Sequence, residues 1–206
     1  MTGLIGRLVR YFVPPPVARV EDLKALVARE CAHISQKVPI DYVEARAHAF
    51  APQLFTEKPF LDALHTCTRE SYAAILGDLL ILVEGALRPH AGPSALQAAD
   101  RIAGLYGEII AGLDPPSGRI KGWAEPEAAF QGRFAHARSH PPAPAADVVV
   151  HAGECMFKTL PLHQRFTRLD QDAIIATVQL RSAIFMETLR KRIDAPTLVA
   201  DLARAP

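Results

Sequence analysis

Two neighbouring apolar stretches decide the fold: YAAILGDLLILVEGAL at residues 72–87 and SALQAADRIAGLYGEIIAGL at residues 94–113. The first is expected to complete a long helix over residues 59–87, which ends at the following proline. Ser94, with Gln97 three residues later, forms a capping box that begins the second helix. Because only a five-residue connection separates the two helices, we expect them to fold back as an antiparallel hairpin.

Small side chains line one face of each helix in this hairpin. The second helix carries one at every fourth position: Ala95, Ala99, Ala103, Gly107 and Ala111. The first carries a matching set, interrupted by Ile81: Ala73, Gly77 and Gly85. A glycine inside a helix costs about 1 kcal/mol relative to alanine, so these glycines call for a packing reason. We expect the two backbones to approach to about 8 Å or less, the lower end of helix spacing.

The rest of the chain also has helical periodicity. Apolar spacing and capping residues predict helices over residues 17–36, 41–50, 127–139, 147–160 and 167–193, and a short one from residue 194. Pro39 is expected to end the first of these, and the Pro- and Gly-rich segment 114–126 is expected to be a loop. The sequence therefore predicts an all-α fold, a single bundle of about seven or eight helices around the central hairpin.

The expected domain organisation has two parts. Residues 1–16 form an amphipathic arm and a proline spacer, and residues 17–206 form one helical domain. That domain comprises the helices of residues 17–113, the loop 114–126 and the C-terminal helices of residues 127–206.

The N-terminal arm carries four apolar residues on one helical face: Leu4, Ile5, Leu8 and Phe12. Pro14, Pro15 and Pro16 follow as a stiff spacer. Two arginines contribute only about 2 kcal/mol at an anionic surface, so residues 1–13 are expected to make at most weak peripheral membrane contact. Docking on a partner, on a second copy or on the protein's own core is the alternative.

The loop contains the single tryptophan, Trp123, near the basic residues Arg119 and Lys121. An aromatic residue flanked by cations is typical of an anchor for a protein partner or for single-stranded nucleic acid. Since tryptophan is highly buried on average, folding of Trp123 back onto the core is the competing interpretation.

A metal site is suggested by Glu30 and His33, which share a helix face at the spacing found in di-iron bundles. Such a site needs a second pair and two further carboxylates. His151 and Glu154 give the pair in reverse order, and Glu84 and Glu108 are the candidate lone carboxylates. The same six residues are equally typical of the polar faces of ordinary amphipathic helices.

Asp78 is unusual because it lies inside the apolar stretch 72–87. Buried carboxylates almost always have partners, so we expect an ion pair with an arginine, and Arg101 is a candidate. His136 and His140, four residues apart, are expected to be solvated surface residues.

Composition limits the class of function. With 206 residues and a net charge of +1, the protein has no long-range field to attract duplex nucleic acid. Cys31, Cys67 and Cys155 show no metal or redox spacing, and reduced thiols suit the cytoplasm. No segment has the length and apolarity of a membrane span, and no catalytic or nucleotide-binding motif is present.

The leading hypothesis is therefore a non-enzymatic interaction, adaptor or assembly protein. It would dock through its arm and the Trp123 loop on a protein partner or a second copy, and no cofactor is expected. One alternative is a metal- or cofactor-binding bundle with oxidoreductase activity. A second alternative is a binder of small hydrophobic ligands, which requires a cavity between helices.

Overall fold

The computed structural model describes residues 15–162 and 169–204. This part of the chain is helical apart from turns, loops and one isolated parallel β-bridge, so the all-α class is confirmed. The N-terminal arm, with Leu4, Ile5, Leu8 and Phe12, lies outside the described residues. No helix in these ranges is both long and apolar enough to cross a bilayer.

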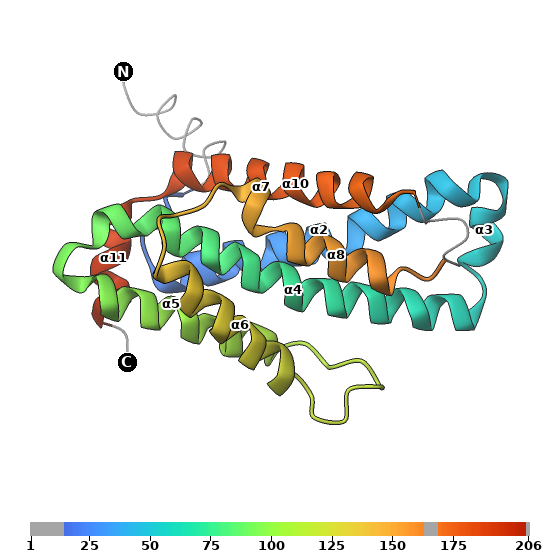
Figure 1. Cartoon of the computed structure of the whole chain (residues 1–206), viewed down its shortest axis with the longest axis horizontal. Coiled ribbons are helices and arrows are strands. Elements are labelled where there is room, and N and C mark those ends of the chain that lie inside the picture. Colours follow the sequence, from blue (N-terminus) through green and yellow to red (C-terminus); the bar gives the residue numbers. More distant parts are fainter. Residues whose placement is uncertain (1–14, 163–168, 205–206) are drawn as a thin grey trace, which may run out of the picture.

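The helices vary widely in length (Figure 1). The longer ones are α2 (Val20–Ala47), α4 (Lys58–Ala91), α5 (Ala95–Ile110), α6 (Ala124–Arg138) and α10 (Gln171–Arg192). The shorter ones are α3 (Ala51–Leu54), α7 (Ala145–Val148), α8 (Val150–Thr159) and α11 (Ala195–Arg204), with the 3-10 turns η1 (His48–Phe50) and η2 (Gly92–Ser94).

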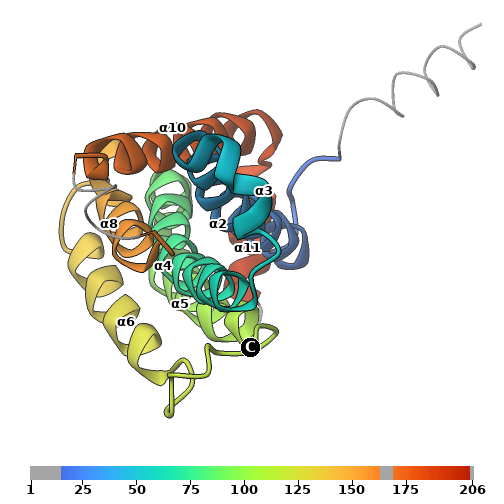
Figure 2. The same cartoon turned by 90° about the vertical axis from the view of Figure 1, so that its right-hand side faces the viewer.

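Helix α4 lies at the centre of the molecule. Every residue from Ala73 to Glu84 is buried, because α2, α5, α6 and α8 all pack against this helix. The end-on view places α4 among α2, α5 and α8 (Figure 2). A helix that is apolar on nearly all sides is typical of such a position, which accounts for the apolar stretch at residues 72–87.

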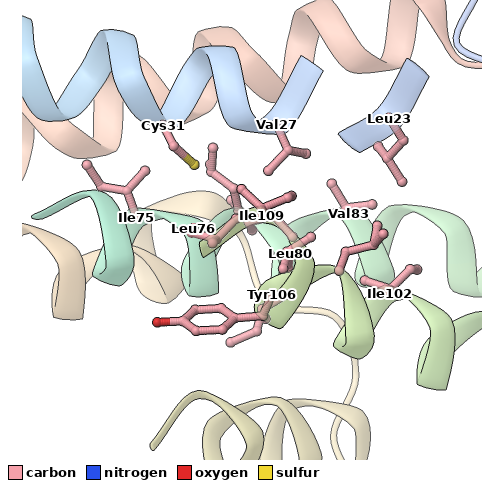
Figure 3. Packing of buried hydrophobic residues seen from close by; sticks show 14 of the residues in the cluster. Leu23, Val27, Cys31, Ile75, Leu76, Leu80, Val83, Ile102, Tyr106 and Ile109 are labelled. Atoms are coloured by element: carbon pink, nitrogen blue, oxygen red, sulfur yellow. The ribbon is translucent and has the colours of Figure 1, made fainter. Parts of the chain in front are cut away.

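The main core fills the space between α2, α4 and α5 (Figure 3). Side chains from all three helices meet there and are almost fully buried: Leu23, Val27, Cys31, Ile75, Leu76, Leu80, Val83, Ile102 and Ile109. Tyr106 points instead toward α6, where its ring stacks on that of Phe130. Burial of a single side chain of this size contributes roughly 1.5–3 kcal/mol, so this cluster dominates the stability of the fold.

The number of helices differs slightly from the expected seven or eight, and the helix end expected at Pro39 does not occur. Instead of ending a helix, Pro39 is buried inside α2, which continues to Ala47. A proline in a helix interior costs about 3 kcal/mol or more. Val38 and Val43, on either side of Pro39, are both buried, and their burial offsets that cost.

The glycines of the expected hairpin serve a different purpose from the one expected. Helix α5 runs back along α4 (Figure 1), and the Tyr106 hydroxyl donates a hydrogen bond to the Ala73 carbonyl at 3.3 Å. However, a Cβ atom added at Gly77 would meet Arg133 and Phe130 of α6, and one at Gly107 would meet Glu127, also of α6. Gly77 and Gly107 therefore make room for side chains of α6 rather than for each other's backbones, and the expected spacing of α4 and α5 stays a prediction.

Close backbone approach occurs at Gly153 of α8. A Cβ atom there would lie 2.8 Å from the Cα atom of Ile175 in α10. No side chain larger than hydrogen fits without a shift of one helix, so Gly153 sets the spacing between α8 and α10.

The start of the described chain is fixed to its end. Val17 donates its N–H to the Arg192 carbonyl at 2.8 Å, and Asp194 donates to the Val17 carbonyl at 3.0 Å. The Asp201 carboxylate of α11 accepts a hydrogen bond from the N–H of Val20, the first residue of α2, at 2.8 Å. An otherwise unsatisfied helix-terminal amide is thereby paired.

Candidate functional site

The six residues considered for a metal site are not gathered in space. Across residues 15–162 and 169–204, no three His, Cys, Asp or Glu side chains are placed to hold an ion together. Glu84 pairs with Arg88 at 2.6 Å. Glu108 accepts hydrogen bonds from Arg101 at 2.5 Å and Lys24 at 2.9 Å, and these two bonds hold the pKa of Glu108 below its ordinary value.

The remaining four residues lie on two other helices. Glu30 is half-buried and His33 exposed on α2, while His151 is exposed on α8 and Glu154 pairs with Lys158 at 3.5 Å. These placements are those of ordinary helix faces. This part of the structure gives the metal-site hypothesis no geometric support.

The Trp123 loop is closed rather than open to a partner. Trp123 is only 9% exposed, and its indole N–H donates to the Leu113 carbonyl at 2.7 Å. The Arg119 guanidinium binds both carboxylate oxygens of Glu70, at 2.6 and 2.7 Å, and lies 5.9 Å from the centre of the Trp123 ring. Trp123 and Arg119 therefore attach the loop to the body, and Lys121 alone of the three expected anchors is exposed.

Asp78 forms the buried ion pair that the sequence predicts, but with a different arginine. Its side chain is fully buried, and it binds the Nη1 atom of Arg133 from α6. The other carboxylate oxygen accepts the N–H of Ala152 at 3.0 Å. Arg101, the candidate named from the sequence, instead pairs with Glu108.

Gly77 is what allows Arg133 to reach Asp78. A Cβ atom at Gly77 would lie 2.8 Å from the Nη2 atom of Arg133, which is too close. Burial raises the pKa of the Asp78 carboxyl to about 6, although the charge of Arg133 and its hydrogen bond, followed by the N–H of Ala152, act to lower it.

A pocket of about 770 Å³ opens beside this ion pair, between α4, α6, α7, α10 and the proline-rich segment 140–144. Apolar side chains make up much of its wall: Ile81, Leu82, Pro141, Pro142, Val148 and Met186. The polar side chains that line it are Arg88, Arg133, His136, His140, Asp147 and Arg190.

The proline-rich wall is held in place by α4. Arg88 binds the carboxylate of Glu84 through two nitrogens, and it also donates to the carbonyls of His140 at 2.6 Å and Ala137 at 3.2 Å. Gly85, on the same side of α4, leaves room for the prolines, since a Cβ atom there would lie 3.2 Å from Pro142. The wall of the pocket is therefore built by contacts distant in sequence.

Two arginines of the pocket retain hydrogen-bonding capacity. Arg133 donates to Asp78 through Nη1, and its Nη2 atom has no acceptor among the described residues. Arg190 is exposed on α10 and makes no ion pair within the described part of the chain. Arg88, by contrast, uses all three of its guanidinium nitrogens.

The sequence pattern contained part of this site. Asp78 stood out as a charge in an apolar helix, whereas Arg133 lies in a helix of mixed character with no apolar stripe. Gly77, directly before the buried Asp78, was the sequence feature beside which Arg133 packs. Comparison of the chain with family models, with characterised proteins and with solved structures gives no match.

Proposed function

We propose that this protein binds a small molecule with an apolar body in the pocket between α4, α6 and α10. The observation that carries the proposal is the pocket itself. Its volume of about 770 Å³ lies within the range of roughly 300–1,000 Å³ that small-ligand sites occupy. Such sites combine apolar walls with a few fixed polar groups, as this pocket does.

The rigidity of the walls supports the same function. Arg133 is fixed from behind by Asp78, and Arg88 is fixed by Glu84, which is only 5% exposed. A site formed in advance loses less conformational entropy when a ligand binds. This proposal replaces the interaction hypothesis as the leading one, because two of the three expected loop anchors, Trp123 and Arg119, are engaged within the protein.

The test uses N-phenyl-1-naphthylamine, an uncharged probe whose fluorescence rises in apolar surroundings. Gly132 lines the pocket, and a Cβ atom there meets no atom within 4 Å, so Gly132→Phe fills the pocket without disturbing the core. We expect the probe to bind the unaltered protein and Gly132→Phe to raise its Kd about tenfold or more, equivalent to about 1.4 kcal/mol.

The matched control is Ala135→Phe, which adds the same ring to an exposed position of α6 that does not line the pocket. This variant is expected to bind the probe like the unaltered protein. Absence of binding by the unaltered protein, or equal Kd values for all three proteins, contradicts the proposal.

A second candidate function, assembly through a homo-oligomer, is favoured by the outer face of α10. Leu180 and Ile184 are one turn apart and are 61% and 48% exposed. Large apolar side chains exposed on one helix face are typical of a contact surface. Light scattering on the unaltered protein and on Leu180→Glu tests this candidate; a monomer in both cases rules it out. Docking through residues 1–13 and a cytoplasmic location stay predictions.

A further inference from the structure

We propose that the ligand of this pocket carries a single carboxylate on an alkyl body, and that Arg133 and Arg190 bind the carboxylate. The inference rests on the proposed ligand-binding function and adds the chemical class of the ligand. The inference depends on which hydrogen-bond donors in the pocket wall already bind an acceptor within the protein and which do not.

Arg133 is the first donor. An arginine carries five N–H groups, and within the described residues only Nη1 of Arg133 has an acceptor. Its Nε atom is fully buried and also lacks a partner, so a ligand cannot reach it. The Nη2 atom is outside that buried set, and the side chain is 30% exposed in the pocket wall. Nη2, which packs over Gly77, is the terminal guanidinium nitrogen of Arg133 without an acceptor among the described residues, and the side chain of Arg133 lines the pocket.

Arg190 is the second donor. It lies on the α10 side of the pocket, is exposed, and has no acidic partner in residues 15–162 and 169–204. Arg88 is excluded as a ligand anchor because Glu84 and two backbone carbonyls take its guanidinium nitrogens. Of the three guanidinium groups in the wall, two are thus accessible, one partly shielded and one without an acidic partner among the described residues; His136 and His140 also line the pocket.

The charge of the ligand follows from the rest of the wall. Asp147 also lines the pocket, and the positive charge of Arg133 is already partly balanced by Asp78. A second negative charge on the ligand would be repelled by Asp147, the carboxylate in the pocket wall, while Asp78 leaves less positive charge on Arg133 to balance it. A monoanion is therefore the charge state that the donors favour, and guanidinium groups bind carboxylates well.

The apolar side chains of the pocket indicate the chemical nature of the uncharged part of the ligand. Ile81, Leu82, Val148 and Met186 line the same pocket and offer no polar atoms to a sugar, base or peptide. Unbranched alkyl groups fit such a wall, and the flexible side chain of methionine adapts to them. A medium-chain fatty acid has this combination of one carboxylate and an alkyl chain.

The experiment measures displacement of N-phenyl-1-naphthylamine by decanoate, by decan-1-ol and by decyl phosphate at pH 8. Decanoate is expected to displace the probe with a Kd about tenfold lower than that of decan-1-ol. Decyl phosphate, a dianion at this pH, is expected to bind more weakly than decanoate.

Two variants locate the carboxylate. Arg190→Gln is at an exposed position, and Asp78→Asn combined with Arg133→Gln removes both buried charges together and avoids leaving one unpaired. Each is expected to lower the preference for decanoate over decan-1-ol at least threefold, when both ligands are measured on the same variant against its own Kd for the probe. Lys191→Gln is the control, because Lys191 is the neighbouring exposed cation and does not line the pocket.

The inference is overturned if decanoate binds no better than decan-1-ol, if decyl phosphate binds best, or if the variants at Arg133 and Arg190 keep the full preference. These outcomes differ from failure of the proposed function, in which the uncharged probe itself does not bind or is unaffected by Gly132→Phe.

Discussion

The two sides of α4 pack against different kinds of side chain. Toward α2 and α5, α4 presents Leu76, Leu80 and Val83 to a fully apolar core (Figure 3). Toward α6 and the proline-rich segment it presents Gly77 and Gly85, with charged side chains beside them. The first side is filled by apolar side chains, whereas on the other side Arg133 lies over Gly77, Pro142 lies over Gly85, and a pocket remains.

The largest effect is expected from Arg133→Ala, which leaves the carboxylate of Asp78 buried without its cation. Removal of one partner of a buried ion pair destabilises a protein by about 3–5 kcal/mol. Guanidinium denaturation measures the free energy of unfolding. The double variant Asp78→Asn with Arg133→Gln should lose less free energy of unfolding than Arg133→Ala, because no unpaired charge is left. Equal stability of Arg133→Ala and the unaltered protein would mean that this pair contributes nothing.

A pair of glycine substitutions compares a crowded position on the pocket side with an open one. At Gly77 a new Cβ atom meets Arg133 at 2.8 Å and Phe130 at 3.1 Å, so Gly77→Ala is expected to destabilise by about 1–3 kcal/mol. At Gly132 a Cβ atom meets nothing within 4 Å, so Gly132→Ala is expected to stabilise by up to about 1 kcal/mol through helix propensity. Thermal denaturation of both variants checks that the stability changes have opposite signs. An increase in stability for both variants would show that α6 can shift to make room for the new methyl group.

The smallest expected effect is a change with pH in the free energy of unfolding, caused by Asp78 on the α6 side of α4. Because burial raises the pKa of Asp78 from 3.8 to about 6, the folded state holds this proton more tightly than the unfolded state. The resulting stabilisation is complete below pH 3.8 and is lost as the pH rises through 6. Between pH 7.5 and 5, the unaltered protein should gain about 1 kcal/mol relative to Asp78→Asn. Parallel urea titrations test this, and a loss on acidification would reverse the assigned direction.

Periodicity predicted the helices whose partners are apolar. The 72–87 stretch and the seam of α10, with Val178, Phe185 and Leu189, are buried as their spacing indicates. These contacts depend only on the pattern of large apolar residues, which a single sequence displays. Pro39 was misjudged because the local cost of a proline is visible in a sequence, whereas the burial of Val38 and Val43 that offsets it is tertiary.

Only a few features of the pocket and of the ion pair beside it could be predicted from the sequence. Asp78 required a cation, but nothing near it in the sequence identifies Arg133, 55 positions away. The glycines indicated close packing without indicating which helix approaches. From the sequence, Trp123 could be either an anchor for a partner or a core residue. The hydrogen bond from its indole N–H to the Leu113 carbonyl, which distinguishes the two, depends on the geometry of the loop.

The attachment of Val17 to residues 192–194, and of the Val20 amide to Asp201, has a consequence for biosynthesis. The N–H of Val20 meets its acceptor only after Asp201, 181 positions later in the sequence, has been synthesised. Contacts between residues so far apart in the sequence slow folding, and removal of α11 by a protease would take away the acceptor of the Val20 N–H.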